Sequence, residues 1–126
     1  MEFDKNILII SSLVLYLIDM VYISQIKDQY TKMIQNIQHS PMKVRISSAI
    51  ICYLFLILAI NYFILNDQQK TEKDAFILGL SIYGVYDATN YALIDKWDKN
   101  MAIIDTIWGG ILFYLTTIIT KQFTKK

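Results

Sequence analysis

Four long apolar runs constrain the fold of this chain more than any other feature of the sequence. They cover residues 6–24, 45–65, 74–94 and 101–120. A helix of about 20 apolar residues crosses the ~30 Å hydrocarbon core of a membrane, so each run is long enough to span it. The last two connections are short and charged, which makes neighbouring helices antiparallel. The sequence therefore predicts one integral membrane domain over residues 1–126, an all-α polytopic membrane protein built as an antiparallel four-transmembrane-helix bundle.

The composition agrees with insertion into a membrane and excludes one class of partner. Hydrophobic residues make up 55% of the chain, and the formal net charge is only +1. No basic face is large enough to neutralise several phosphates, so we expect no nucleic-acid partner. The single cysteine, Cys52, cannot form an internal disulfide. In its apolar run we expect it to be a small buried hydrophobic residue.

The longest polar connection, residues 25–44, carries a helical pattern of its own. Apolar side chains recur in it at helical spacing, at Ile26, Tyr30, Ile34 and Ile37. Two structures agree with this pattern: an amphipathic helix that lies in the membrane interface between spans 1 and 2, or a solvated helical arm. His39 precedes a serine and a proline, which together predict a helix end. We expect its side chain to be solvated and not to bind a metal.

Counting the spans predicts the side of each connection but not the orientation. Four spans place both termini and the second connection on one side of the membrane. The first and third connections lie on the other side. Lysines and arginines divide six against six between the two sides, so the positive-inside rule assigns no orientation.

Three aspartates lie within the predicted spans, where a carboxylate is energetically costly. They are Asp19 in the first span, Asp87 in the third and Asp105 in the fourth. Measured from the span centres at about 1.5 Å per residue, each lies roughly 5–8 Å from the midplane, on the same side of it. Three spans are thus predicted to contribute a carboxylate to one layer, beneath the first and third connections.

Helical spacing places further polar and aromatic residues near these acids. The candidate intramembrane polar pocket consists of Asp19, Tyr22, Asp87, Asn90, Asp105, Trp108 and Arg45. Arg45 opens the second span at the depth of the acids, and its long side chain makes it their candidate partner. Gly84 and Gly109 are expected to permit close helix approach beside the acids. On the second helix, the same reasoning favours an inner face made of Ser48, Cys52, Phe55, Ala59 and Tyr62.

The acid layer allows two interpretations. Three ionised carboxylates in a low-dielectric pocket repel one another, so they require protons, a cation or water. In the first interpretation the pocket binds a lipid headgroup, a proton or a hard cation such as Mg²⁺ or Ca²⁺. The protein would then be a small transporter or an accessory to lipid modification. In the second, the same groups lock the helices together through interhelical hydrogen bonds, and the protein is a structural membrane component.

Three motifs carry a resemblance to a known family. They are Asp19-Met20-Val21-Tyr22 in the first span, Tyr86-Asp87-Ala88-Thr89-Asn90 in the third and Asp105-Thr106-Ile107-Trp108-Gly109 in the fourth. In length, span count and motif order the whole chain resembles the uncharacterised membrane family catalogued as domain of unknown function 2177. Family members usually have tryptophan where this chain has Tyr22.

This resemblance implies a four-helix bundle and a set of marked residues. The marked residues are Asp19, Asp87, Asn90, Asp105 and Trp108. Bacterial relatives are often found beside genes for fatty-acid modification, which implies a link to lipid metabolism but no particular activity.

No familiar catalytic signature accompanies these residues. The sequence has no HExxH, histidine box, P-loop, GxSxG or paired Cys/His spacing. We therefore predict no cofactor and no dedicated metal site, and enzyme activity stays open. The expected partners are membrane lipids, together with further copies of the chain or other membrane proteins. A composition rich in isoleucine, lysine and asparagine is typical of an AT-rich genome. The expected source is an AT-rich microbe or a large DNA virus, and the expected location is the cell membrane or the internal membrane of the virion.

Overall fold

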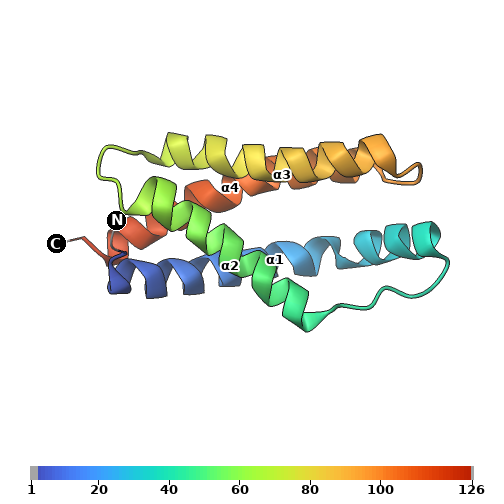
Figure 1. Ribbon diagram of the computed structural model, residues 1–126, viewed down its shortest axis with the longest axis horizontal. Coiled ribbons are helices and arrows are strands. Elements are labelled where there is room, and N and C mark those ends of the chain that lie inside the picture. The colour runs from blue at the N-terminus through green and yellow to red at the C-terminus, as the bar shows by residue number, and fades with distance from the viewer. Residues whose placement is uncertain (1–2, 126) are drawn as a thin grey trace.

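The computed structural model describes residues 3–125 and consists of four long helices (Figure 1). They are α1 (Lys5–Gln38), α2 (Ile46–Ile60), α3 (Glu72–Leu93) and α4 (Lys99–Phe123), and a π-helical turn, η1 (Asn61–Leu65), continues α2. α1 begins and α4 ends at the same end of the bundle (Figure 1). Residues 3–125 contain no strand. The predicted all-α fold is therefore confirmed.

Three helical segments within residues 3–125 are long and apolar enough to cross a membrane. They are α1, α2 together with η1, and α4. The 22 residues of α3 form about 33 Å of helix, which is long enough to span. However, Asp87, Asn90 and three tyrosines make its second half more polar. A multi-span chain is thus supported by three helices, and α3 as the fourth span stays a prediction.

α1 is longer than the predicted first span because residues 25–38 continue it without a break. Its 34 residues extend for about 51 Å, well beyond the ~30 Å of a hydrocarbon core. The helical character predicted for this connection is confirmed. These residues form no separate interfacial helix, however, which corrects that prediction. The helix ends at Gln38, and His39 caps it in the left-handed conformation, with φ of 58°.

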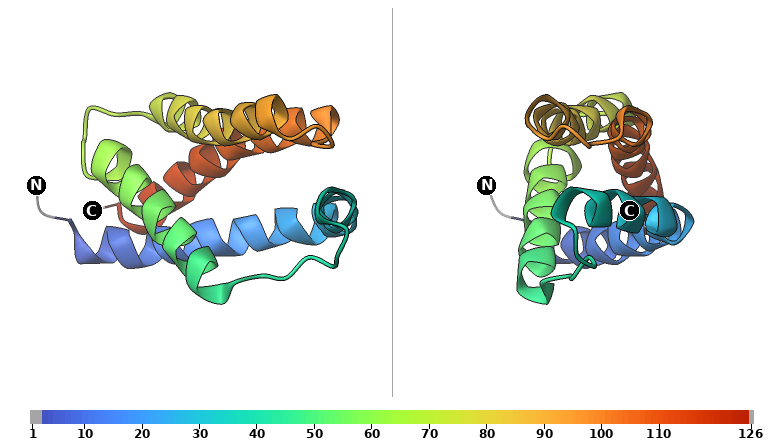
Figure 2. Two further views of the ribbon diagram at one scale, coloured as in Figure 1. Left: turned by 45° about the vertical axis from the view of Figure 1, so that its right-hand side comes forward. Right: turned by 90° about the vertical axis from the view of Figure 1, so that its right-hand side faces the viewer.

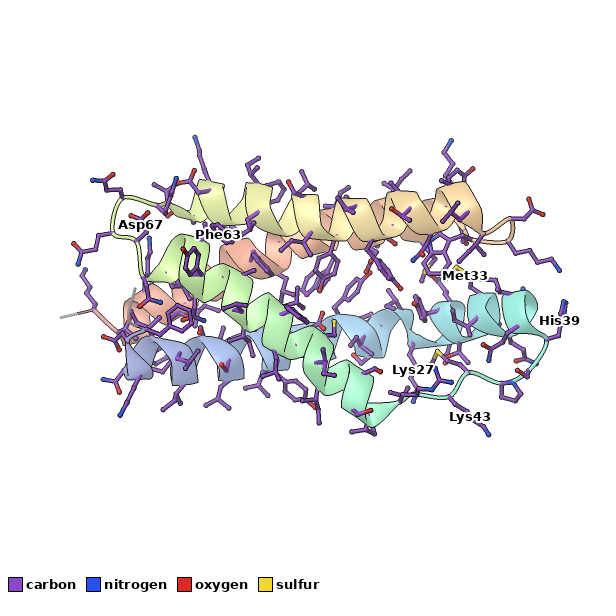
Figure 3. The ribbon with its side chains drawn as sticks, viewed as in Figure 1. Lys27, Met33, His39, Lys43, Phe63 and Asp67 are labelled. Carbon is purple, nitrogen blue, oxygen red and sulfur yellow. The ribbon has the colours of Figure 1, made fainter. Side chains whose placement is uncertain are left out.

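The physical reason for this long helix is a second small core beyond the first span. Ile26, Tyr30, Ile34 and Ile37 pack around buried Met33, Trp97 and Met101. Figure 3 shows Met33 between α1 and the α3–α4 hairpin. Its sulfur accepts a hydrogen bond from the Asp98 backbone N–H, at 3.3 Å. The apolar stripe of residues 25–38 is therefore buried against the chain itself.

α3 and α4 form the closest helix pair of the bundle, and small residues permit it. A Cβ atom on Gly79 would overlap the Gly109 carbonyl oxygen and the Phe113 ring. A Cβ on Gly109 would overlap Tyr83. By contrast, a Cβ on Gly84 would meet only the Thr106 methyl group, at an ordinary 3.5 Å. The predicted role of Gly109 is confirmed, and that of Gly84 belongs to Gly79.

α2 is inclined across α1, so that its first residues lie farther from α3 than its last (Figures 1 and 2). α2 packs mainly against α1, and its continuation η1 reaches α1, α3 and α4. Leu56 and Ile60 anchor the second half of α2 in the main core. The first half of α2 therefore diverges from α3.

A buried polar cluster holds η1 to the start of α1. Asn61 is fully buried, and its side-chain amide donates to the Ser11 hydroxyl (3.0 Å) and the Ile57 carbonyl (2.9 Å). Asn66 donates to the Asn61 carbonyl (3.0 Å) and accepts from the Asp4 backbone N–H (3.0 Å). These polar groups therefore satisfy one another within the chain.

Candidate functional site

A cavity of about 470 Å³ lies between α1, α2 and α3, and α4 contributes one residue to its lining. Its walls are mainly apolar, and the carboxylates of Asp19 and Asp105 line it. Five of the nine tyrosines also line it: Tyr22, Tyr30, Tyr53, Tyr83 and Tyr86. The α1–α2 connection contributes Met42 and Val44. The volume lies within the range of small-molecule sites.

Asp19 is held at this cavity by hydrogen bonds from two other helices. The residue is only 6% exposed. Tyr53 on α2 donates its hydroxyl hydrogen to Oδ2 at 2.5 Å, and Trp108 on α4 donates its indole N–H to Oδ1 at 2.9 Å. Each carboxylate oxygen thus has one hydrogen-bond donor, so the side chain is fixed in orientation. They also join α1, α2 and α4 at one point.

Tyr22 links the second carboxylate to the same cluster. Its hydroxyl donates to Asp105 Oδ1 at 3.0 Å. Its ring stacks on Trp108, with centroids 4.5 Å apart and planes inclined by 6°. Trp108 therefore packs against one partner of Asp105 while it donates to Asp19. In this way α1 and α4 present two acids to the cavity in a defined arrangement.

Asp87 is buried, at 2% exposed, but does not line the cavity. The side chains close enough to act on its carboxyl group are those of Asp105, Trp97 and Thr106. Its Oδ2 atom and the Trp97 indole N–H nevertheless have no hydrogen-bond partner. Asp105 acts through its charge on both Asp19 and Asp87. The three acids of the predicted layer therefore share one neighbourhood, and two of them face the cavity.

Two of the predicted pocket residues lie apart from the cavity. Arg45 is exposed at the N-cap of α2 and makes no side-chain capping bond. It lies where α2 diverges from the bundle and does not line the cavity, which does not support its predicted pairing with the acids. Asn90 is half-buried on α3 and is also absent from the cavity wall. The residues that the structure brings into direct contact are Asp19, Tyr22, Asp105 and Trp108.

Within residues 3–125, no basic side chain acts on the carboxylate of Asp19. The groups that do act on it are Tyr53, Trp108 and Asp105. Lys27 lines the cavity eight residues further along α1, about 12 Å of helix away, and its side chain is exposed. Figure 3 shows Lys27 on the side of α1 that faces the α1–α2 connection. Among residues 3–125 there is no group of three acidic, histidine or cysteine side chains that could hold a metal ion.

Sequence reasoning missed Tyr53 because the predicted inner face of α2 is only partly correct, although Ala59 of that face does pack against the main core. Phe55 and Tyr62, on the predicted inner face, are 66% and 48% exposed. Tyr53, Leu56 and Ile60 point inward instead. α2 is apolar on all sides, so no polar stripe marks its outer face. The 3–4 spacing of these three residues was the only available signal.

The position of Cys52 is a second correction. It is exposed, not buried, and it lines the cavity. Because α2 diverges from α3 here, the side chain has no neighbouring helix to bury it. As the sole cysteine of the chain, it provides one thiol at the cavity wall.

Comparison with known proteins assigns the chain to a family. A model of predicted membrane proteins, the domain of unknown function 2177 (DUF2177), matches residues 6–122. The chain belongs to this family. No curated protein and no solved structure matches the chain. In this DUF2177 protein, the motif residues Asp19 and Asp105 line the cavity and Trp108 donates to Asp19, whereas Asp87 does not line it.

Proposed function

We propose that this DUF2177 protein is a multi-pass membrane protein that binds a lipid in the cavity between α1, α2 and α3. One observation carries the proposal: a cavity of about 470 Å³ combines mainly apolar walls with the polar groups of Asp19, Tyr22 and Asp105. A lipid supplies both an apolar chain and a polar group, so it complements both parts of the cavity.

The position of the cavity along the helices supports a lipid as the occupant. Two of its walls come from α1 and α2, which are both candidate membrane spans. Asp19 lies within the first of them, well before the part of α1 that extends beyond a hydrocarbon core. The molecules that surround a cavity at this depth are membrane lipids.

A lipid agrees with the geometry better than a lone cation does. Ca²⁺ takes about 6–8 oxygen ligands and Mg²⁺ takes about six in octahedral geometry. Here Asp19 and Asp105 are the two carboxylates at the cavity, and the rest of the wall is mainly apolar or aromatic. Both acids already accept hydrogen bonds that orient them. Such acids are suited to bind a polar headgroup and to hold it in one place.

Binding of this kind suits a transporter of lipids or an accessory protein that presents a lipid for modification. In either case the helices provide the binding site. The bound lipid is then moved across the membrane or modified by a partner enzyme. The hydrogen bonds that Asp19 and Asp105 accept fix the orientation of both carboxylates, which suits them to hold a headgroup in either role.

A structural role is the second candidate, and one observation favours it. The hydrogen bonds from Tyr53 and Trp108 make Asp19 a link between α1, α2 and α4. Interhelical bonds of this type can stabilise a bundle with no ligand present. In this alternative the protein is a structural membrane component, and the internal membrane of a virion remains a prediction from composition alone.

Lipid retention after purification distinguishes the two candidates. Ala49 lines the cavity on α2, so Ala49→Phe places a ring in the cavity. Ala88 is exposed on α3, so Ala88→Phe adds the same ring outside and serves as the matched control. We expect native mass spectrometry to show bound lipid on the wild type and on Ala88→Phe, and little or none on Ala49→Phe.

The structural candidate predicts a different result. If lipid adducts are equally abundant on all three proteins, they are not held in the cavity, and the lipid-binding proposal fails. The thiol of Cys52 gives an independent check of the same point. A lipid in the cavity should slow the reaction of Cys52 with N-ethylmaleimide, and delipidation should restore the rate.

A further inference from the structure

The mainly apolar wall of the cavity contains both acidic and aromatic side chains. Asp19 and Asp105 line it together with five tyrosine side chains. Behind them, Trp108 stacks on Tyr22 in a parallel arrangement. The face of an aromatic ring carries negative electrostatic potential. The lining of the cavity thus combines two acidic side chains with five aromatic rings.

Although Lys27 lines the same cavity about 12 Å of helix further along α1, no basic side chain within residues 3–125 acts on Asp19. Tyr53 and Trp108 donate neutral hydrogen bonds to it, and the nearest charged influence is the like charge of Asp105. Asp105 in turn accepts from the neutral hydroxyl of Tyr22. An unpaired carboxylate at membrane depth is costly, and a second one nearby increases that cost. A positively charged ligand would remove this cost.

We propose that the lipid bound here carries a cationic amine in its headgroup, which Asp19 and Asp105 neutralise and the tyrosine rings surround. The inference rests on the proposed lipid-binding function and names its ligand class. Carboxylate oxygens have further lone pairs beyond those used by Tyr53, Trp108 and Tyr22, so they can accept from an ammonium group. Aromatic rings attract ammonium groups, methylated or not, through cation–π interaction.

The remainder of the cavity indicates that the amine belongs to a lipid and not to a soluble molecule. Ile23, Ile26, Leu56 and Ile82 are among the apolar residues that line most of its wall. A free amine would leave this apolar surface uncovered, whereas an acyl chain would bury it. Phosphatidylethanolamine and phosphatidylcholine share the required chemistry, and phosphatidylglycerol lacks the amine.

A competition among lipids tests the proposal. The full-length protein is equilibrated with equal amounts of phosphatidylethanolamine, phosphatidylcholine and phosphatidylglycerol that carry identical acyl chains, and adducts are counted by native mass spectrometry. We expect the amine lipids to exceed phosphatidylglycerol by about tenfold or more, since one charge-assisted contact in a dry site strengthens binding by at least that factor.

Matched variants locate the preference in the cavity. Asp19→Asn with Asp105→Asn removes both charges at the cavity, and Asp105→Asn alone leaves the contacts of Asp19 intact. Asp28 and Asp95 are exposed, so Asp28→Asn with Asp95→Asn removes the same number of charges elsewhere. We expect the first pair to abolish the amine preference while lipid remains bound, the single variant to reduce it, and the control pair to leave it unchanged.

The outcomes separate the two proposals. If phosphatidylglycerol binds as well as the amine lipids, or if the cavity variants keep the preference, the amine inference fails and lipid binding stands. If the wild type retains no lipid of any kind, both fail. If free choline or ethanolamine binds as tightly as the lipid with the same headgroup, the acyl chain contributes nothing and the lipid assignment is overturned.

Discussion

Asp19 and Asp87 are both buried aspartates, yet they differ in whether their carboxylate oxygens have hydrogen-bond donors. Asp19 accepts a hydrogen bond on each oxygen, from Tyr53 and from Trp108. Asp87 leaves Oδ2 without any partner. A buried acceptor that is satisfied contributes to stability, whereas one that is left unpaired costs free energy. The same residue type should therefore respond in opposite ways to the same substitution.

Substitution by asparagine tests this contrast at the two positions. In Asp19→Asn, an amide NH₂ replaces one acceptor oxygen, so the free energy of unfolding should fall by about 1–3 kcal/mol. In Asp87→Asn, no hydrogen bond is lost at Oδ2, so the unfolding free energy should be no lower than that of the wild type. Thermal unfolding in detergent measures both. A large loss in Asp87→Asn would mean that Oδ2 has a partner in the folded protein.

At the scale of the elements, the α3–α4 pair depends on glycine at one contact. Gly79 lies against the backbone of Gly109, which cannot move aside as a side chain can. Gly84, one and a half turns further along the same helix, has room for a methyl group. Close contact of the two helices therefore requires glycine at position 79, whereas position 84 tolerates a larger residue.

Alanine at these two positions should give different stabilities. Gly79→Ala forces the helices apart, and we expect a loss of about 1–3 kcal/mol in the free energy of unfolding. Gly84→Ala should be neutral or slightly stabilising, because alanine is the better helix former. Reversible unfolding in mixed detergent compares them. Equal losses in both variants would show that helix contact is not the cause.

At the scale of the whole molecule, the sidedness of the connections depends on α3. α1 begins and α4 ends at one end of the bundle, and residues 66–71 lie at that end too (Figure 1). The α3–α4 connection and the second half of α1 lie at the other end. Because α3 is about 33 Å long, it can cross a membrane despite its polar second half.

Cysteine labelling tests this topology in a Cys52→Ala background. Gln68→Cys and Lys96→Cys lie in the two connections that flank α3, and Asn36→Cys lies near the end of α1; all three positions are exposed. We expect a membrane-impermeant maleimide to label positions 36 and 96 from one side and position 68 from the other. Leu17→Cys, within the first span and 62% exposed to its surroundings, should stay unlabelled. Labelling of positions 68 and 96 from the same side would exclude α3 as a span.

Part of the candidate site was predictable because helical periodicity relates residues on one helix. The depth estimate placed Asp19 and Asp105 in one layer, and the structure brings both to the cavity. The same estimate could not tell that Asp87 does not line the cavity. Depth along an axis contains no information about rotation around it, and the rotation of each helix depends on what it packs against.

The sequence by itself determined the helical class, the family and the main carriers of charge at membrane depth. Run length, hydropathy and motif order are properties of the sequence of each helix, so they can be read without knowing how the helices pack. The tertiary structure alone decided that α1 continues to Gln38, that Tyr53 and not Phe55 points inward, and that α2 diverges to open a cavity. These features arise from side-chain packing between helices, where an apolar residue can face lipid or protein at similar cost, so composition does not distinguish the two.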